Sequence, residues 1–293
     1  MKYFYLIANP GREGTSQAVR EIQAYLKKRG AVCTGCKSRA PEKGETSDLC
    51  FTEASEIPAE TECVITLGGD GTLIQAARDL VELQLPMIGV NLGHLGYLTQ
   101  VARGESALPM LDALMEDRFT LEKRMMLEAR LVGDERQRRG IALNDIVLTR
   151  KDMLQALNFR VYLNGVLFNE YMADGMIVAT PTGSTAYNLS AGGPIVAPGA
   201  ELILVTPVCA HSLFSRSIVL PPEDIVSIRL AGDQCEKQTV VLDGKQRFLI
   251  GEGDTLEIRR AKKATKLIQL SDVSFLENIR RKMNQIGVQE GRK

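Results

Sequence analysis

The N-terminal third of the chain alternates short apolar runs with amphipathic stretches. Residues 2–8 are almost wholly apolar and predict a buried strand, which the following Asn-Pro-Gly ends. A helix is expected to begin at Thr15 or Ser16 and to end at Gly30, because apolar residues recur between them at helical spacing. Residues 35–60 are rich in Gly, Pro, Ser, Thr and Glu, and this composition predicts a long connection with little regular structure.

A second strand-and-helix pattern follows with a glycine-rich turn inside it. Residues 63–67 read as a buried strand, Gly68-Gly69-Asp70-Gly71-Thr72 as a turn, and residues 73–83 as an amphipathic helix. Residues 87–90 are again apolar and predict another strand. A strand, a helix and a strand in this order form a βαβ unit, which predicts a layered α/β domain.

The pattern changes near Phe119, where β-branched and aromatic segments replace helical periodicity. Asn164-Gly165 between two such segments is typical of a two-residue hairpin turn. We expect an all-β region with strands in residues 127–132, 142–149, 159–163, 175–180, 218–220, 225–230, 239–242 and 255–260.

The last predicted element is a helix over residues 275–286, which Ser274 and Glu277 open as a capping box and Gly287 ends. The expected fold class is therefore α/β plus all-β. A Rossmann-like α/β domain covers residues 1–118 and is completed by the final helix, in residues 272–293, which returns to it. A β-sandwich-like domain covers residues 119–271.

Charge and composition narrow the classes of function. The 293 residues carry 36 Lys and Arg against 36 Asp and Glu, and the sequence pI is near 6.8. Nucleic-acid-binding modules usually carry a basic surplus, so we expect no nucleic-acid partner. No apolar stretch is long enough to span a membrane and the N-terminal run is too short for a signal peptide, so we expect a cytoplasmic protein with no membrane partner.

The six cysteines are expected to be reduced and structural, as in most cytosolic proteins. Cys33 and Cys36 form a single CxxC pair. A zinc site would need two further ligands, and only Cys50 and Cys63 lie near, at unusual spacings. We therefore expect no metal site built from protein ligands, although a redox role for the CxxC pair stays open.

The glycine-rich turn has two interpretations. Its backbone N–H groups, at the start of a helix, can form a phosphate cradle. A tight turn that needs glycine for a positive φ is the other interpretation, and glycines alone do not decide between them. Asp70 favours the first one, because a carboxylate in an anion-binding turn is unfavourable unless it holds a proton, a metal-bound water or a substrate hydroxyl.

The GGDGT sequence after an apolar strand resembles a motif shared by NAD kinases, diacylglycerol-type lipid kinases and phosphofructokinases. The second half of the chain favours the first of these families, because the hydroxyl-rich segment around Gly183 closely resembles the long NAD kinase motif. The resemblance runs from residue 7 to about residue 244. It is carried by residues 68–72, 91–97, 143–145, 171–175, 180–194 and 211–216.

The resemblance implies Mg²⁺-dependent transfer of the terminal phosphoryl group of ATP, or of polyphosphate, to the 2′-hydroxyl of the adenosine ribose of NAD. It implies that Gly68, Gly69, Gly71 and Thr72 hold the donor phosphates with Mg²⁺. Tyr97 and Asp243 are expected near the ligand, and a homodimer or homotetramer is expected. The residues implied to hold the dinucleotide are Asn144, Asp145, Asp174, Thr182, Thr185, Ala186, Tyr187 and Ser190. Asp145 stands where the family usually has a glutamate, one methylene longer.

Asp70 is the expected general base. The chain has only two histidines, His94 and His211, so a histidine metal site or a Ser–His–Asp triad is very hard to build. We expect the active site to lie between the two domains, where pockets are common. Two alternatives remain at this stage: a lipid kinase of the same superfamily, which predicts an apolar acceptor pocket, and a dinucleotide-binding sensor without transfer activity.

Overall fold

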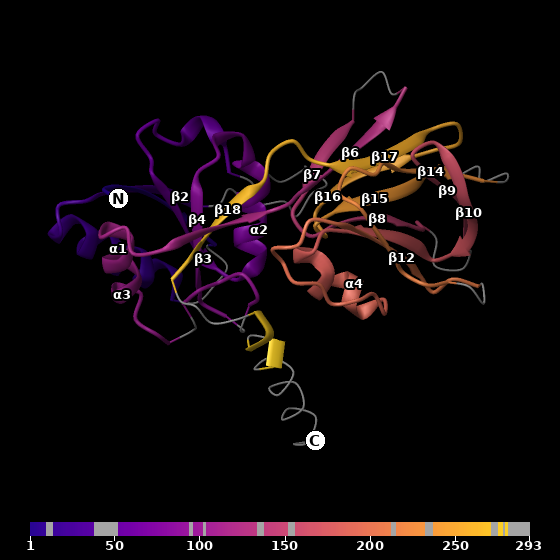
Figure 1. The fold of residues 1–293 in the computed structure, drawn as a ribbon. Helices are drawn as coiled ribbons and strands as arrows, with labels where there is room; N and C mark the ends of the chain where they lie inside the picture. Colours follow the sequence, from indigo (N-terminus) through magenta and orange to yellow (C-terminus); the bar gives the residue numbers. More distant parts are fainter. Residues whose placement is uncertain are drawn as a thin grey trace. The chain divides into compact units, whose positions relative to one another are not determined.

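The computed structural model describes residues 1–9, 14–37, 52–93, 96–101, 104–133, 138–151, 156–211, 215–231, 237–270, 275–277 and 279–280. The chain divides into two compact units (Figure 1). The first unit holds residues 1–46, 50–123 and 265–293, and the second holds residues 47–49 and 124–264.

The first unit is built on one sheet with the strand order β2-β1-β3-β4-β18-β5. The pairs β1–β2, β1–β3, β3–β4 and β4–β18 are parallel, as expected of successive βαβ connections. The strands are β1 (Tyr3–Ala8), β2 (Val32–Lys37), β3 (Cys63–Gly68), β4 (Pro86–Asn91), β5 (Thr120–Arg124) and β18 (Thr265–Gln269).

Three helices accompany this sheet: α1 (Thr15–Lys28), α2 (Asp70–Asp79) and α3 (Leu108–Met115), with short 3₁₀ turns η1 (Ala54–Glu56) and η2 (Val81–Leu83). Helices α1 and α3 bury Ile22, Leu26 and Leu111 in one cluster with alternate residues of β1, β3 and β4. Helix α2 contacts β3 and β4 through a separate set of buried residues. The central strand β3 is consequently buried along its whole length.

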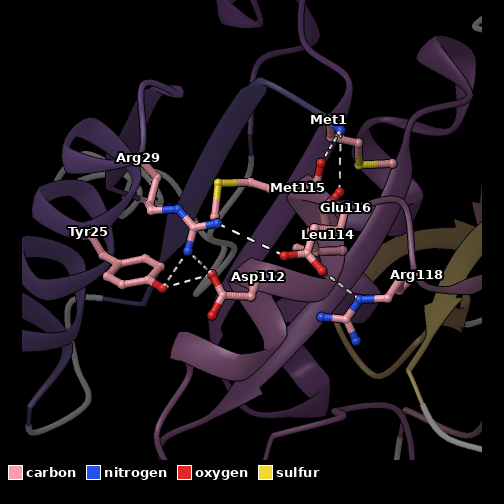
Figure 2. Close-up of polar contacts among 8 residues, drawn as sticks. All are labelled: Met1, Tyr25, Arg29, Asp112, Leu114, Met115, Glu116 and Arg118. Atoms are coloured by element: carbon pink, nitrogen blue, oxygen red, sulfur yellow. Dashed lines mark hydrogen bonds and ion pairs between the residues drawn. The ribbon is translucent and has the colours of Figure 1, made fainter.

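Polar contacts also join α1 to α3 (Figure 2). The Tyr25 hydroxyl donates to Asp112 Oδ1 at 2.7 Å, and Arg29 Nη1 lies 2.5 Å from the same oxygen. The hydrogen bond to Asp112 raises the pKa of Tyr25. One carboxylate on α3 therefore fixes two side chains of α1, while Glu116 pairs with Arg118 next to them at 2.7 Å.

The second unit contains two sheets. One has the order β10-β9-β14-β17-β6-β7 and the other the order β13-β12-β11-β8-β15-β16. The first comprises β6 (Leu127–Val132), β7 (Arg139–Ala142), β9 (Leu157–Leu163), β10 (Val166–Ala173), β14 (Val226–Leu230) and β17 (Thr255–Arg260). The second comprises β8 (Asp145–Thr149), β11 (Gly175–Ala179), β12 (Ile203–Val208), β13 (Ile218–Leu220), β15 (Gln238–Leu242) and β16 (Gln246–Ile250).

These two sheets pack face to face. Phe159 and Ile228 from one sheet and Val178 and Leu242 from the other belong to a single buried cluster. Neighbouring strands in both sheets are antiparallel, as expected of a sandwich. Part of the outer face of the sheet that contains β8 is buried as well. The chain passes from β11 through the 3₁₀ turn η3 (Thr182–Thr185) and the short helix α4 (Tyr187–Ser190), and residues after α4, such as Ala191 and Val196, pack on that face.

The expected fold class, α/β plus all-β, is confirmed. The pattern assigns residues 119–271 to the second domain, whereas the structure places β5 and β18 in the sheet of the first unit. The reason is that β18 pairs with β4, through Lys266 opposite Pro86, rather than with its neighbour in sequence, β17. Of the expected final helix, the described residues 275–277 and 279–280 are helical, and the remainder, with Ser274 and Gly287, lies outside the described residues.

Candidate functional site

The glycine-rich segment leads directly from β3 into α2. The helix begins at Asp70, three residues earlier than the sequence pattern suggests, so Asp70 and Gly71 form its first turn and Gly69 is the N-cap. Gly68, Gly69 and Gly71 all have φ outside the left-handed region. The segment therefore does not need glycine for a positive φ, and the tight-turn interpretation loses its physical basis.

The three glycines differ in what surrounds them. A Cβ on Gly68 would overlap Thr72 Oγ1, so the approach of the Thr72 side chain requires glycine at this position. A Cβ on Gly69 or Gly71 would meet no atom within 4 Å. Backbone N–H groups in the first turn of a helix lack partners inside the helix and favour anions. The open space over Gly69 and Gly71 therefore suits the close approach of a phosphate group.

The Asp70 carboxylate is held by the loop after β4. Its Oδ2 accepts the main-chain N–H of Tyr97 at 2.5 Å, and its Oδ1 accepts that of Leu98 at 3.1 Å. A Cβ on Gly96 would overlap Asp70 Oδ1, so this contact requires glycine at position 96. Each carboxylate oxygen keeps a second lone pair, so Asp70 can still accept a hydrogen bond from a substrate.

Tyr97 contributes to this arrangement through its main chain. Burial and the neighbouring charge of Asp70 raise the pKa of its phenol, which therefore stays neutral near pH 7. The motif at residues 91–97 predicts that Tyr97 lies near the ligand, but it predicts no role for Gly96 or Leu98. Gly96 lies in the same quoted motif, whereas nothing in the sequence marks the Leu98 N–H.

In the second unit, the Asp243 carboxylate organises a three-residue turn. Its Oδ2 accepts the N–H of Leu143 at 2.9 Å, and its Oδ1 accepts the N–H groups of Asn144 at 2.7 Å and Asp145 at 3.2 Å. The Asp243 N–H in turn donates to the Asp145 carbonyl at 3.0 Å. Asp243 therefore positions Asn144 and Asp145, which is a role that the sequence pattern does not reveal.

A second set of hydrogen bonds joins this turn to the hydroxyl-rich segment. The Thr180 hydroxyl donates to the Leu143 carbonyl at 2.6 Å and accepts the Gly183 N–H at 3.0 Å. The Thr180 N–H also donates to the Asn144 carbonyl at 2.9 Å. A Cβ on Gly183 would overlap that same carbonyl, so the two segments pack backbone against backbone.

The turn that these two sets of hydrogen bonds hold borders a pocket of about 380 Å³. Its floor is the outer face of the β8 sheet, because Asp145, Val147 and Thr149 alternate along β8 and therefore point to the same side. The pocket is lined by Asn144, Asp145, Val147, Thr149, Ala186, Tyr187, Val241, Asp243 and Gly244. Five of the expected ligand-binding residues thus meet in one cavity, and Tyr187, 46% exposed, offers a ring face to it.

Asp145 is the most perturbed carboxyl group of this pocket. It is 5% exposed, and burial together with the nearby charge of Asp243 raises its pKa to about 7. The group therefore changes its charge close to physiological pH, which is typical of a residue that meets a ligand.

The hydroxyl groups of the segment after β11 mostly stabilise the segment itself. Thr185 Oγ1 donates to the Thr182 carbonyl at 3.4 Å, and buried Thr182 Oγ1 accepts from Arg124 at 3.4 Å. Ser184 Oγ bonds to the main chain of Val196. Ser190 is exposed. Thr182, Thr185 and Ser190 do not line the pocket, so their contact with a ligand stays a prediction.

Asp174 lies apart from this cavity. Because β8 and β11 are antiparallel with Asp145 opposite Ala179, Asp174 lies just before the far end of β11, about 17 Å from Asp145 by strand rise. Its Oδ1 forms an ion pair with Arg150 Nη1 at 2.8 Å. Within one chain, therefore, Asp174 does not line the same pocket as Asn144 and Asp145.

The described residues hold no cluster of three or more His, Cys, Asp or Glu side chains that could bind a metal ion. Cys50 and His94 lie outside the described part of the chain, and Cys63 is fully buried. Among the helices that the structure describes, none has both the length and the hydrophobicity to cross a membrane.

Known sequence families match both units. A model of the ATP-NAD kinase N-terminal domain matches residues 4–119, and a model of the ATP-NAD kinase C-terminal domain matches residues 143–270. The NAD kinase of Agathobacter rectalis is 43% identical over 286 residues, which cover 97% of this chain and 99% of the relative. That of Lachnospira eligens is 40% identical over 296 residues, with coverage of 97% and 100%.

Solved structures share the fold. A yeast NADH kinase crystallised with NADH superposes with a TM-score of 0.82 at 24% identity, covering 96% of this chain and 86% of the yeast chain. An NAD kinase from Archaeoglobus fulgidus in complex with ATP gives a TM-score of 0.72 at 20% identity, covering 96% and 98%. With both domain models matched and these close relatives over nearly its whole length, the chain belongs to the NAD kinase family, whose members are phosphotransferases.

Proposed function

We propose that the protein transfers the terminal phosphoryl group of ATP to the 2′-hydroxyl of the adenosine ribose of NAD, giving NADP. One observation carries the proposal beyond family membership: Asn144, Asp145, Ala186, Tyr187 and Asp243 come from three separate segments of sequence and line a single pocket. Its valine side chains, Val147 and Val241, its exposed tyrosine and its buried carboxyl group suit a nucleoside, which has a flat base and several hydrogen-bond donors.

The triphosphate is the ligand of the first unit in this proposal. The open space over Gly69 and Gly71 admits phosphate oxygens to the first turn of α2, where the helix dipole favours negative charge. Gly68 and Thr72 shape this turn through their mutual contact. Mg²⁺ would be held by the phosphates of the nucleotide and would neutralise their charge, since the described residues offer it no cluster of acidic ligands.

Asp70 is the proposed general base. As the ribose O2′ bonds to the terminal phosphorus, the bond from that phosphorus to the bridging oxygen breaks, and the 2′-hydroxyl proton passes to the Asp70 carboxylate. Phosphoryl transfer asks the protein mainly for positioning and charge neutralisation. The two N–H groups of Tyr97 and Leu98 fix the carboxylate in one orientation, which supports this role.

NAD contacts are assigned to the pocket of the second unit. Tyr187 stacks on a ring of the ligand, and Asn144 and Asp145 bond to its polar groups, while Asp243 holds both of them in place. Contacts by Thr182, Thr185, Ser190 and Asp174 are further proposals, which depend on movement of these side chains or on another copy of the chain. We also propose a cytoplasmic homodimer or homotetramer, and leave polyphosphate and NADH as alternative substrates to be assayed.

The test is NADP formation from Mg²⁺-ATP and NAD, measured with an NADP-specific dehydrogenase. Asp70→Asn is expected to lower turnover by about 10²- to 10⁴-fold, because a positioned base contributes that much. The asparagine NH₂ group would face one of the main-chain N–H donors of Tyr97 and Leu98, and two donors cannot bond to each other. Circular dichroism and NAD affinity must therefore show that the variant is folded. Glu82→Gln, at an exposed position just beyond α2, is the matched control.

Each alternative has its own outcome. No NADP from folded wild-type protein, with polyphosphate and NADH also tried, would contradict the proposal. NAD binding without turnover would then indicate a sensor, and binding to lipid vesicles would indicate a lipid kinase. Turnover of Asp70→Asn at the wild-type rate would remove Asp70 from the mechanism.

A further inference from the structure

Asp145 is a buried carboxyl group at the pocket wall to which no described residue donates a hydrogen bond. It is 5% exposed, and the charged group that acts on it among the described residues is another carboxylate, Asp243. A buried carboxylate without donors is unfavourable, and the pocket is the direction from which donors can come.

The neighbouring main chain cannot supply those donors, because Asp243 already accepts the N–H groups of Leu143, Asn144 and Asp145. Three such bonds favour the ionised form of Asp243. Asp243 therefore acts as a fixed negative charge beside Asp145, and it disfavours a second negative charge until a ligand contributes donors.

The described residues that line the pocket around Asp145 carry no compensating positive charge. The strand β11 places Ala179 opposite Asp145, and α4 contributes Tyr187 to the same pocket. No Lys, Arg or His belongs to the residues that line the pocket in the described structure. The protonation of Asp145 is thus controlled by burial, by Asp243 and by the ligand alone.

We propose that a neutral donor group of the nucleoside, either a ribose hydroxyl or the exocyclic amine, binds the ionised Asp145 carboxylate, and that NAD binding is therefore coupled to release of one proton. The inference rests on the proposed function, since it takes NAD as the occupant of the pocket. No bond of the ligand breaks: the Asp145 carboxyl loses its proton to the buffer, and the hydrogen bond from the ligand takes its place.

The size of the coupling follows from the free protein. With a pKa of about 7, Asp145 is mostly protonated at pH 6 and mostly ionised at pH 8. If only the ionised form accepts the ligand, the dissociation constant of NAD at pH 6 is about tenfold higher than at pH 8. The proton released on binding approaches one per site at pH 6 and falls close to zero at pH 8.

Isothermal titration calorimetry of NAD, without ATP, tests the inference. Titrations at pH 6, 7 and 8 in two buffers of different ionisation enthalpy give both the affinity and the number of protons released. Asp145→Asn is expected to bind NAD more weakly, with no proton release and a flat pH profile. The control Asp224→Asn removes a half-buried carboxylate that accepts a hydrogen bond from Asn164, away from the residues that line the pocket, and it should match the wild type.

Nicotinamide hypoxanthine dinucleotide, which lacks the exocyclic amine, identifies the donor. Loss of proton release with this ligand assigns the amine, and unchanged release assigns a ribose hydroxyl, so either result supports the coupling. Wild-type protein that binds NAD with equal affinity at pH 6 and 8 and releases no proton would overturn the inference while leaving the proposed function intact. Absence of NAD binding at every pH would overturn both. The wild-type titrations decide the matter even if Asp145→Asn does not fold.

Discussion

Replacement of Asp145 by asparagine should stabilise the protein in the absence of ligand, and more so at higher pH. Burial, with the charge of Asp243, raises the pKa of Asp145 to about 7 from its ordinary 3.8. Between these values the folded protein holds a proton that the unfolded chain has released, so a rise in pH destabilises the fold. At about 1.4 kcal/mol per pH unit, the cost reaches about 4 kcal/mol at pH 7 and changes little above it.

Urea unfolding at pH 5, 6, 7 and 8 measures this effect as a difference between two proteins, so that all other titrating groups cancel. The chain has no tryptophan, so circular dichroism is the suitable signal. The stability advantage of Asp145→Asn should grow by about 2–3 kcal/mol from pH 5 to pH 8, mostly below pH 7. Asp224→Asn should show no such trend. A difference that stays constant, or that shrinks as pH rises, would refute the reasoning, because Asp145 would then be ionised at its ordinary pKa.

Three glycine substitutions test the packing described above. Gly71→Ala should raise the free energy of unfolding by up to about 1 kcal/mol, since glycine disfavours helix. It should nevertheless lower turnover at least about tenfold, because the added methyl group fills the space proposed for the donor phosphates. Unchanged turnover would contradict the proposed phosphate cradle. Gly96→Ala should displace the Asp70 carboxylate and lower turnover at least about 100-fold, while calorimetry shows unchanged NAD affinity. A proportional loss of NAD affinity would instead indicate general misfolding. Gly183→Ala should lower the free energy of unfolding, measured with urea, by about 1–3 kcal/mol, because its Cβ overlaps the Asn144 carbonyl. It should also weaken NAD binding. Wild-type stability of this variant would show that the two segments can separate.

The sequence predicts the strands β1, β3 and β4 of the first unit well because they are mostly buried on both sides. The run at residues 63–67 and the run at 87–90 become β3 and β4 almost residue for residue. The position of β18 was not predictable, since nothing in the sequence of residues 265–269 indicates which sheet they join. Only their pairing with β4, far away in the sequence, assigns them to the first sheet.

The candidate site shows the same limit. Sequence motifs identify Asn144, Asp145 and Tyr187, and the structure brings them to one pocket. They do not reveal that Asp243 acts through three main-chain N–H groups about a hundred residues away, or that the Thr182 and Thr185 hydroxyls are used within their own segment. Such roles depend on which partner a polar atom meets after folding, and residue type alone does not determine that partner.

The unequal surroundings of the glycines before and inside α2 have an evolutionary consequence. Folding requires Gly68, because Thr72 occupies the space of its Cβ, whereas nothing in the fold requires Gly71. A descendant that kept this architecture but stopped transferring phosphate would be free to replace Gly71, and selection for stability would favour the change, while Gly68 would persist. The retention of both glycines together with Asp70 in this chain is what continued selection for phosphate handling would leave behind.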